Sequence, residues 1–346
     1  MLAGEYAVLR GGHALAVTLG CGMNIKVEWQ NHAAEWEIHS NLWSEPKFVR
    51  DDHTPQIDML CRAVQFAAKR CSMHGGKVTV SSDIEIKHGV GSSSALRLGV
   101  CAAFFTIKNG PDHSRPGGLP LEAVNAAWQL QSEGQGVASG YDIATQYAGG
   151  LVEFSYEYHD NKWKPHWFKH DLNNLSHIAH VFVGGIGAPT AQTTQTTSAW
   201  LEGANRHEKL LENSESLVDA FNMAIQWPEP RHIKKLIQAC SATRQLFVGS
   251  PHFPTEVAEQ IQSIPGCDKS WSWKTTGAGG EDAILLIGKA SEISAAAQKL
   301  WDIGWHRINV PFSASGAQIV SSDSAERSGT GPRKSEPTIE TETGRE

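Results

Sequence analysis

His88-Gly89-Val90-Gly91-Ser92-Ser93-Ser94-Ala95-Leu96, called the serine turn below, is the stretch that says most about the fold of this chain. Its glycines allow backbone N–H groups to converge on an anion, and the N-terminus of a following helix favours negative charge. Its serines add hydroxyls that can cap the helix or ligate a metal ion. The pattern predicts a phosphate-binding turn, with a plain capped turn as the competing interpretation.

The flanking sequence places the serine turn between a strand and a helix. Residues 77–80 and 84–86 alternate apolar and polar side chains as half-buried strands do, and residues 95–105 are apolar enough for a buried helix. The turn lacks the Gly-Lys-Ser/Thr ending of a Walker P-loop and the third glycine of a dinucleotide fingerprint.

Two further motifs lie near the ends of the chain. The first motif is LAGEYAVLRGGHALAV at residues 2–17, and the third motif is KTTGAGGEDA at residues 274–283. Together with the serine turn, in this order, they resemble the signature motifs of the GHMP kinases, over roughly residues 1–320. Tyr6, the segment ASGYDIA at 138–144 and the segment YAGG at 147–150 resemble the phosphomevalonate kinase form.

The resemblance implies an α+β protein with the two-domain GHMP kinase fold. A nucleotide-binding α+β domain would occupy residues 1–175, and a ferredoxin-like α+β sandwich would occupy residues 176–320, with the active site in the cleft between them. Residues 321–346 are rich in Ser, Thr, Gly, Pro and Glu. They carry too little apolar surface to offset the entropy of ordering, so we expect a disordered tail.

The resemblance also implies roles for single residues. Asp142 matches the aspartate beside the acceptor oxygen, as general base or electrostatic partner, with a helix cap as the competing interpretation. The residues expected to bind the ATP phosphates are Gly89, Val90, Gly91, Ser92, Ser93, Ser94 and Ala95. The residues expected to shape that site from the third motif are Thr276, Gly277, Ala278, Gly279 and Gly280. The residues expected to contact the acceptor are Glu5, Tyr6, His13, Ser139, Gly140, Gly187 and Thr190.

ATP and Mg²⁺ are the expected cofactors. Ser93 would face the metal ion, and Glu133 is the acidic candidate, because Gln131 stands where mevalonate kinases carry a metal-ligating glutamate. The Pro-Gly-Lys that normally precedes the first motif is absent. Either the start codon is placed too late or a catalytic cation has been lost.

A phosphorylated acceptor needs more than one cationic or N–H-rich anion site. The candidates near the motifs are Arg10, His13, Lys87, His88, Arg97, Lys274 and the backbone amides of residues 185–190. Arg97 lies on an otherwise apolar helix, so a snorkelling or salt-bridged arginine is an equal alternative there.

Composition restricts the partners and the compartment. A net charge of −7, without clustered Lys and Arg, argues against nucleic acid. The six cysteines form no Cys-x-x-Cys pair, which predicts reduced thiols in the cytoplasm. Since no apolar run is long enough to span a bilayer and no signal peptide is present, we expect no membrane partner. A small-molecule partner is expected, and the sequence leaves open whether the protein forms a homodimer.

The second half of the chain continues to alternate between strands and helices. Residues 180–183 read as a strand that runs into a glycine-rich turn and a threonine-rich helix. Residues 207–250 read as two amphipathic helices interrupted by WPEP at 227–230. Residues 283–288 and 307–311 read as strands around a helix at 292–301.

The leading prediction is an ATP-dependent kinase that phosphorylates phosphomevalonate in the mevalonate pathway to isoprenoid precursors. One alternative is a GHMP kinase for mevalonate or a sugar, because acceptor choice depends on pocket residues that the motifs do not report. The other is a catalytically impaired nucleotide-binding protein that lacks the N-terminal lysine.

Overall fold

The computed structural model describes residues 1–50, 58–84, 89–136, 138–159, 162–184, 190–203, 206–277, 279–280 and 283–320, except for the side chains of Gln135, His159, Lys162, Thr190 and Ala191. The predictions on Lys87, His88, Gly187, Ala278 and the tail at 321–346 lie outside the described residues. The same holds for residues 85–86 of one predicted strand.

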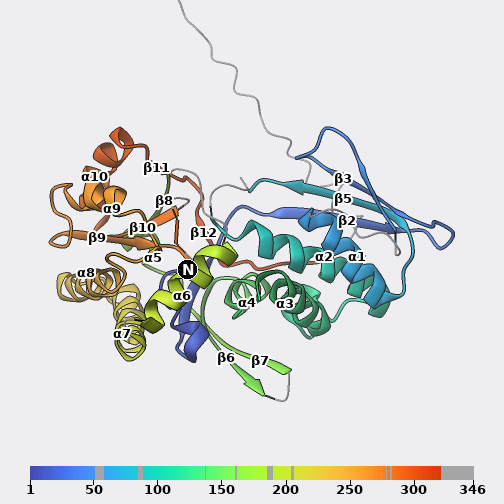
Figure 1. Ribbon diagram of the computed structural model, residues 1–346, viewed down its shortest axis with the longest axis horizontal. Coiled ribbons are helices and arrows are strands. Elements are labelled where there is room, and N and C mark those ends of the chain that lie inside the picture. Colours follow the sequence, from blue (N-terminus) through green and yellow to red (C-terminus); the bar gives the residue numbers. More distant parts are fainter. Residues whose placement is uncertain are drawn as a thin grey trace, which may run out of the picture.

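Three four-stranded sheets carry the fold (Figure 1). The first has the order β2 (Met23–Trp29), β5 (Gly76–Ser82), β3 (Trp36–Ser40) and β4 (Lys47–Val49), with β3 and β5 parallel and the other pairs antiparallel. The helices of this half are α1 (Met59–Cys71), α2 (Ser92–Asn109) and α3 (Leu121–Gln135). Helix α2 packs against α1, α3 and β2, so its N-terminus is held rigidly between neighbouring elements.

The second sheet lies in the middle of the molecule and is antiparallel throughout. Its order is β12 (Phe312–Ser313), β1 (Ala14–Leu19), β6 (Leu151–His159) and β7 (Lys162–His170). Helix α4 (Tyr141–Ala148) packs on β1 and β6, and it also contacts α2 and α3. Short 3-10 turns occupy Val8–Arg10 and Pro116–Gly118.

The third sheet is antiparallel, with the order β11 (His306–Arg307), β8 (Ala179–Val183), β10 (Ala283–Gly288) and β9 (Trp271–Thr275). Every residue of β10 is buried. The helices of this half are α5 (Leu175–Ile178), α6 (Thr190–Gly203), α7 (His207–Gln226), α8 (Pro230–Gln245), α9 (Thr255–Gln262) and α10 (Ala290–Asp302). The predicted helix pair around WPEP is confirmed, since prolines at 228 and 230 cannot continue the hydrogen-bond ladder of α7.

The apolar cores join distant parts of the chain. One cluster includes Trp36 and Phe104 in the half that holds α2. A second joins Leu2 and Leu15 of the first motif to Phe221 of α7. Burying one such large side chain contributes about 2 kcal/mol, so the first motif is anchored to the helices of the third sheet.

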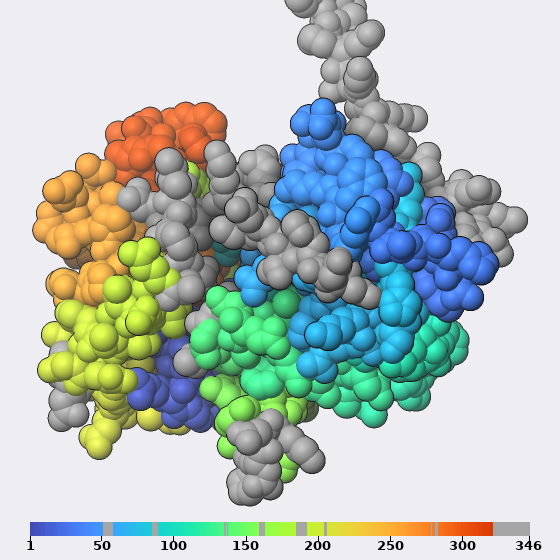
Figure 2. All heavy atoms as spheres, turned by 45° about the vertical axis from the view of Figure 1, so that its right-hand side comes forward, coloured from blue at the N-terminus to red at the C-terminus, as the bar shows by residue number. Residues whose placement is uncertain are grey.

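The end of the described chain returns to the earlier part of the molecule. In Figure 2 the residues coloured yellow-green to red-orange form one body and most of those coloured light blue to green form another beside it, while the dark-blue start of the chain lies against the first body. Ser313 pairs with Thr18 of β1, and the Ala317 N–H donates to the Gln146 carbonyl at 2.7 Å. The domain boundary at residue 175 stays a prediction.

The predicted strand at 307–311 is wrong beyond its first residue. β11 ends at Arg307, where it pairs with β8, and the Gly20 N–H bonds to the carbonyl of Pro311 at 2.8 Å. The segment passes from the edge of the third sheet to the edge of the second. A single continuous strand could not form hydrogen bonds with both sheets. The other predicted strands and helices that fall on described residues are present, with two exceptions. Ile84 is not in a strand, because β5 already ends at Ser82, and residues 246–250 are not helical, because α8 ends at Gln245.

All six cysteines are free thiols, and five of them are buried. Among the described residues, no helix combines the length and the apolar character needed to cross a membrane.

Candidate active site

The N-terminus of α2 begins at the serine turn with its backbone donors free of any side-chain cap. Gly91 is the N-cap residue, at φ 88° and ψ 23°, and no side chain of a described residue caps the helix. The expectation that a serine caps it is therefore wrong, because a left-handed glycine already turns the chain into the helix. The first-turn N–H groups of Ser92, Ser93 and Ser94 have no intrahelical partner, which favours an anion in front of them.

Asp142 lies in the first turn of α4 and joins three helices. Its Oδ2 accepts hydrogen bonds from the Ser94 hydroxyl of α2 and from Gln131 Nε2 of α3, the latter at 2.8 Å. Its Oδ1 accepts the Ile143 N–H at 2.9 Å. The N-cap of α4 is Gly140, so Asp142 is not the cap residue. The carboxylate is held next to the serine turn by side chains from two other helices.

Arg97 lies one turn after Ser94 and is only 5% exposed. Its Nη1 has no hydrogen-bond partner, and Arg97 neither snorkels to solvent nor pairs with any described carboxylate. Burial lowers the pKa of Arg97, against the opposing effect of the Asp142 charge. Unpartnered polar atoms also occur on Gln131 and Ser132 of α3. Asp142, Ser94, Gln131 and Arg97 are called the Asp142 cluster below.

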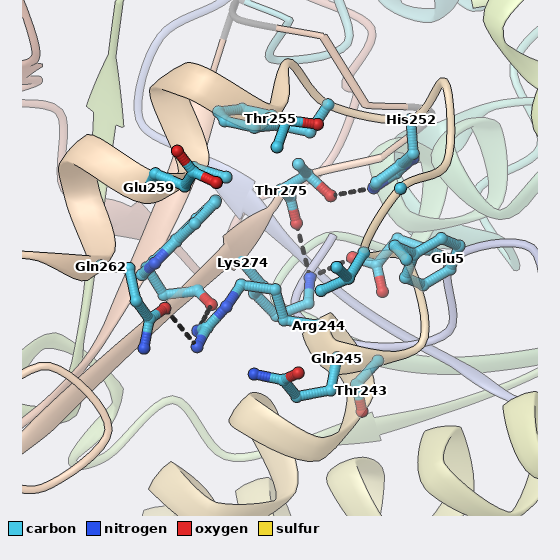
Figure 3. A pocket seen from close by; sticks show the side chains of 16 residues that line it. Glu5, Thr243, Arg244, Gln245, His252, Thr255, Glu259, Gln262, Lys274 and Thr275 are labelled. Atoms are coloured by element: carbon cyan, nitrogen blue, oxygen red, sulfur yellow. Dashed lines mark hydrogen bonds and ion pairs between the residues drawn. The ribbon is translucent and has the colours of Figure 1, made fainter.

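The first motif contributes a buried ion pair. Glu5 and Lys274 are 4% and 3% exposed, and Lys274 Nζ pairs with Glu5 Oε1 and donates to the Thr275 carbonyl at 2.6 Å. Figure 3 shows both side chains beside Thr275. The positive φ of 104° at Gly4 lets the chain lie directly against Ala14, where a side chain would collide. Motifs 269 residues apart in sequence thus meet at one buried contact.

Tyr6 is buried among aromatic side chains. Its ring lies 5.7 Å from that of Phe247 and 5.4 Å from that of His252, and its hydroxyl donates to the Thr193 carbonyl of α6 at 3.4 Å. Burial raises the pKa of Tyr6 to about 12, so this hydroxyl stays a donor at neutral pH.

The third motif lies between α4 and the segment around His252. A side chain at Gly277 would come within 3.6 Å of the Tyr141 hydroxyl, one residue before Asp142. Gly279, at φ 97°, leaves no room for a side chain beside His252, and the Gly280 N–H donates to the His252 carbonyl at 2.9 Å. Thr276 Oγ1 donates to the Ala283 carbonyl at 3.5 Å.

Other predicted site residues are placed less centrally. His13 is exposed and pairs with Glu153 at 2.8 Å, and Arg10 pairs with Glu202. The Ser139 carbonyl accepts the Trp163 indole N–H at 3.0 Å, and Gly140 lies against the stacked rings of Trp128 and Trp163. Thr190 is the first residue of α6, without a described side chain.

The predicted metal ligands are not brought together by side-chain contacts. Ser93 is half-buried in the first turn of α2, whereas Glu133 is exposed and lies about 200° around α3 from Gln131. Among described residues, no group of three or more His, Cys, Asp or Glu side chains could hold a metal ion.

Sequence reasoning missed Phe247 and His252, which carry no motif of their own. Gln131 was recognised only as a departure from a metal-ligating glutamate, whereas in the structure it binds Asp142. Its position on the buried side of α3, eleven residues before Asp142, is the signal that pointed to it.

Comparisons with known proteins identify a family model that matches part of the chain and solved structures with a similar fold. Residues 58–150 match the family model described as GHMP kinases N terminal domain. No curated protein matches the chain in sequence. Mevalonate kinase of Methanococcus jannaschii is 16% identical, with a TM-score of 0.65 over 90% of this chain and 95% of that one.

Two further solved structures are similar to this chain over most of its length. Phosphomevalonate kinase of Streptococcus pneumoniae, in complex with phosphomevalonate and AMPPNP, is 18% identical, with a TM-score of 0.66 over 90% of this chain and 96% of that one. A D-glycero-D-manno-heptose 1-phosphate kinase from Bacteriodes thetaiotaomicron is 13% identical, with a TM-score of 0.62 over 92% and 94% of the two chains. The chain has the α+β GHMP kinase fold.

Proposed function

We propose that this chain is an ATP-dependent kinase that transfers the γ-phosphoryl group to an oxygen of a small anionic acceptor, with phosphomevalonate as the leading candidate. The observation that carries the proposal is the contact of Asp142 with Ser94, which joins an acceptor-activating carboxylate to the phosphate-binding helix terminus. The GHMP kinase fold and the match over residues 58–150 support it.

The serine turn suits the phosphates of ATP. The uncapped N-terminus of α2 offers backbone donors, and glycines at positive φ leave room for an anion to approach the backbone. When bound, Mg²⁺ would neutralise part of the phosphate charge. Ser93 would be its hydroxyl ligand, with Glu133 as the weaker candidate because it is exposed.

Asp142 would orient the acceptor oxygen and take up any proton that this oxygen carries. The acceptor oxygen, a phosphate oxygen in phosphomevalonate or a hydroxyl oxygen in mevalonate, forms a bond to the γ-phosphorus while the bond to the β–γ bridging oxygen breaks. The proton of a protonated acceptor passes to the Asp142 carboxylate, and ADP leaves. The hydrogen bonds from Ser94 and Gln131 hold the carboxylate in one orientation for this transfer. Arg97 places a buried positive charge near the reacting groups.

Phosphomevalonate is favoured by Tyr6 and by the segment around Asp142, which resemble the phosphomevalonate kinase form. A specific observation favours mevalonate as the second candidate. Among the cations expected to bind a second anionic group, Arg10, His13 and Lys274 each already pair with a carboxylate. An acceptor with a single anionic group would need fewer free cations.

A coupled ADP-release assay on the full chain tests the proposal. Phosphomevalonate, mevalonate and a mannoheptose phosphate are compared by kcat/KM, with Asp142→Asn as the matched inactive control. We expect the highest kcat/KM with phosphomevalonate and competitive inhibition of that acceptor by inorganic phosphate. A higher value with mevalonate would replace the acceptor assignment. ATP binding without ADP release from any of the three would support an impaired nucleotide-binding protein instead.

A further inference from the structure

A cavity of about 220 Å³ lies beside β9 at the edge of the third sheet, and none of its lining residues belongs to the Asp142 cluster. Figure 3 shows Thr255 and Glu259 of α9 on one side, Gln245 at the end of α8 on the opposite side, and Lys274 between them. The cavity is therefore bounded by α8, α9 and β9, and its described lining residues include Lys274, one of the predicted anion-binding candidates.

Aromatic side chains form much of the cavity wall. The rings of Phe247 and His252 stack at 4.5 Å, and those of Phe253 and Trp273 lie 5.1 Å apart. A pocket lined by rings favours a flat, largely apolar ligand that can stack against them.

The charged groups buried at the cavity are already paired. Lys274 pairs with Glu5, and Arg244 pairs with Asp268. A charged ligand would have to break one of these pairs or be desolvated without a counter-ion, and both are costly. The cavity therefore favours an uncharged molecule.

We propose that this cavity binds an uncharged aromatic molecule, and that its binding orders the first motif. The connection is direct, because Glu5 lines the cavity and the wall rings of Phe247 and His252 are the ones against which Tyr6 packs. The site includes Glu5 and Lys274, two of the residues expected near the acceptor, but no residue of the Asp142 cluster.

Isothermal titration of the full chain with benzimidazole, which is flat, aromatic and neutral, tests the site. We expect a single site with a Kd on the order of 0.1–1 mM, as befits a ligand of this size.

A matched pair of cavity variants locates the site. Ala258 of α9 lines the cavity, whereas Ala297 of α10 does not, and both are half-buried against the same apolar cluster. Ala258→Leu should abolish benzimidazole binding by filling the space, and Ala297→Leu should leave it unchanged. Absence of binding to the unmodified chain, or equal binding by both variants, would overturn the proposal.

Amide hydrogen exchange tests the ordering of the first motif without any need for turnover. Saturating benzimidazole should slow exchange in peptides that cover residues 2–10 at least twofold in the unmodified chain, and it should have no effect in Ala258→Leu. Binding without this protection would refute the ordering of the first motif. Because neither readout involves ATP, failure of the kinase proposal would leave both results interpretable.

Discussion

Arg97 and Arg244 are two largely buried arginines in opposite halves of the molecule, and their surroundings differ in kind. Arg244 donates to Ser272 Oγ at 3.0 Å, to the Trp273 carbonyl at 2.8 Å and to Gln262 Oε1 at 2.8 Å, and it pairs with Asp268. Arg97 has an unpartnered Nη1 and no ion pair with a described residue.

The difference separates a structural charge from one available to a ligand. Burial raises the pKa of Asp268, but hydrogen bonds from Ser272 and Gln262 and the charge of Arg244 outweigh this and hold it below its usual value. Arg244 and Asp268 therefore satisfy each other within the fold. An unpaired buried cation such as Arg97 opposes folding, which suggests that its partner arrives with a ligand.

The largest expected effect is that of Asp142→Asn, which asks whether the Asp142 cluster works in turnover. Losing the proton acceptor should lower kcat by about 100- to 10,000-fold, while the KM for ATP changes little. The ADP-release assay measures both. Near-normal kcat with the best acceptor would show that Asp142 does not take part in proton transfer. The half that holds the Asp142 cluster would then not differ in function from the half that holds Arg244.

Replacing each arginine by methionine tests the comparison directly. Arg244→Met strands Asp268 and should lower the free energy of unfolding by about 3 kcal/mol. Arg97→Met should leave that free energy unchanged or raise it, while kcat/KM falls at least tenfold. Urea denaturation and the ADP-release assay give the two values. Equal destabilisation by both substitutions would mean that Arg97 is as structural as Arg244.

His180 in β8 offers a third case for comparison. It is a buried group with an unpartnered nitrogen, and it lies in the same half of the molecule as Arg244. Burial, followed by the charges of Arg307 and His177, lowers its pKa to about 4, and its Nε2 has no hydrogen-bond partner. An unfolded histidine has a pKa of about 6.5, so between these values only the unfolded chain gains a proton. Stability should fall as the pH drops through this window.

The loss of unfolding free energy due to His180 is on the order of 3 kcal/mol between about pH 7 and pH 4. His180→Leu should remove this part of the acid sensitivity, as measured by urea denaturation at several pH values. Identical pH profiles for the variant and the unmodified chain would show that His180 does not titrate on unfolding.

The smallest expected effect belongs to Ser93→Ala. Loss of one hydroxyl that would face Mg²⁺ should raise the KM for Mg·ATP about three- to tenfold, without a change in unfolding free energy above about 0.5 kcal/mol. Kinetics at several Mg²⁺ concentrations measure this. An unchanged KM and kcat would assign the metal to another ligand.

Much of the local structure was predictable from the sequence. The alternation of 77–80, the apolar run of 95–105 and the prolines at 228 and 230 each act within a few residues, and the corresponding β5, α2, α7 and α8 are present. Local patterns failed where a segment serves two sheets, as at 307–311, and where a glycine took the cap position expected of a serine.

The sequence by itself determined the three motifs, their order and the residue types that could perform phosphoryl transfer, because these properties are local in the chain. Only the tertiary structure decided which charged side chains form ion pairs with one another. Glu5 meets Lys274 and Asp142 meets Ser94 across 269 and 48 residues, and no local pattern encodes such pairings. The packing of whole elements sets these contacts. It leaves Arg97 without an ion-pair partner among the described residues, whereas it pairs Arg244 with Asp268.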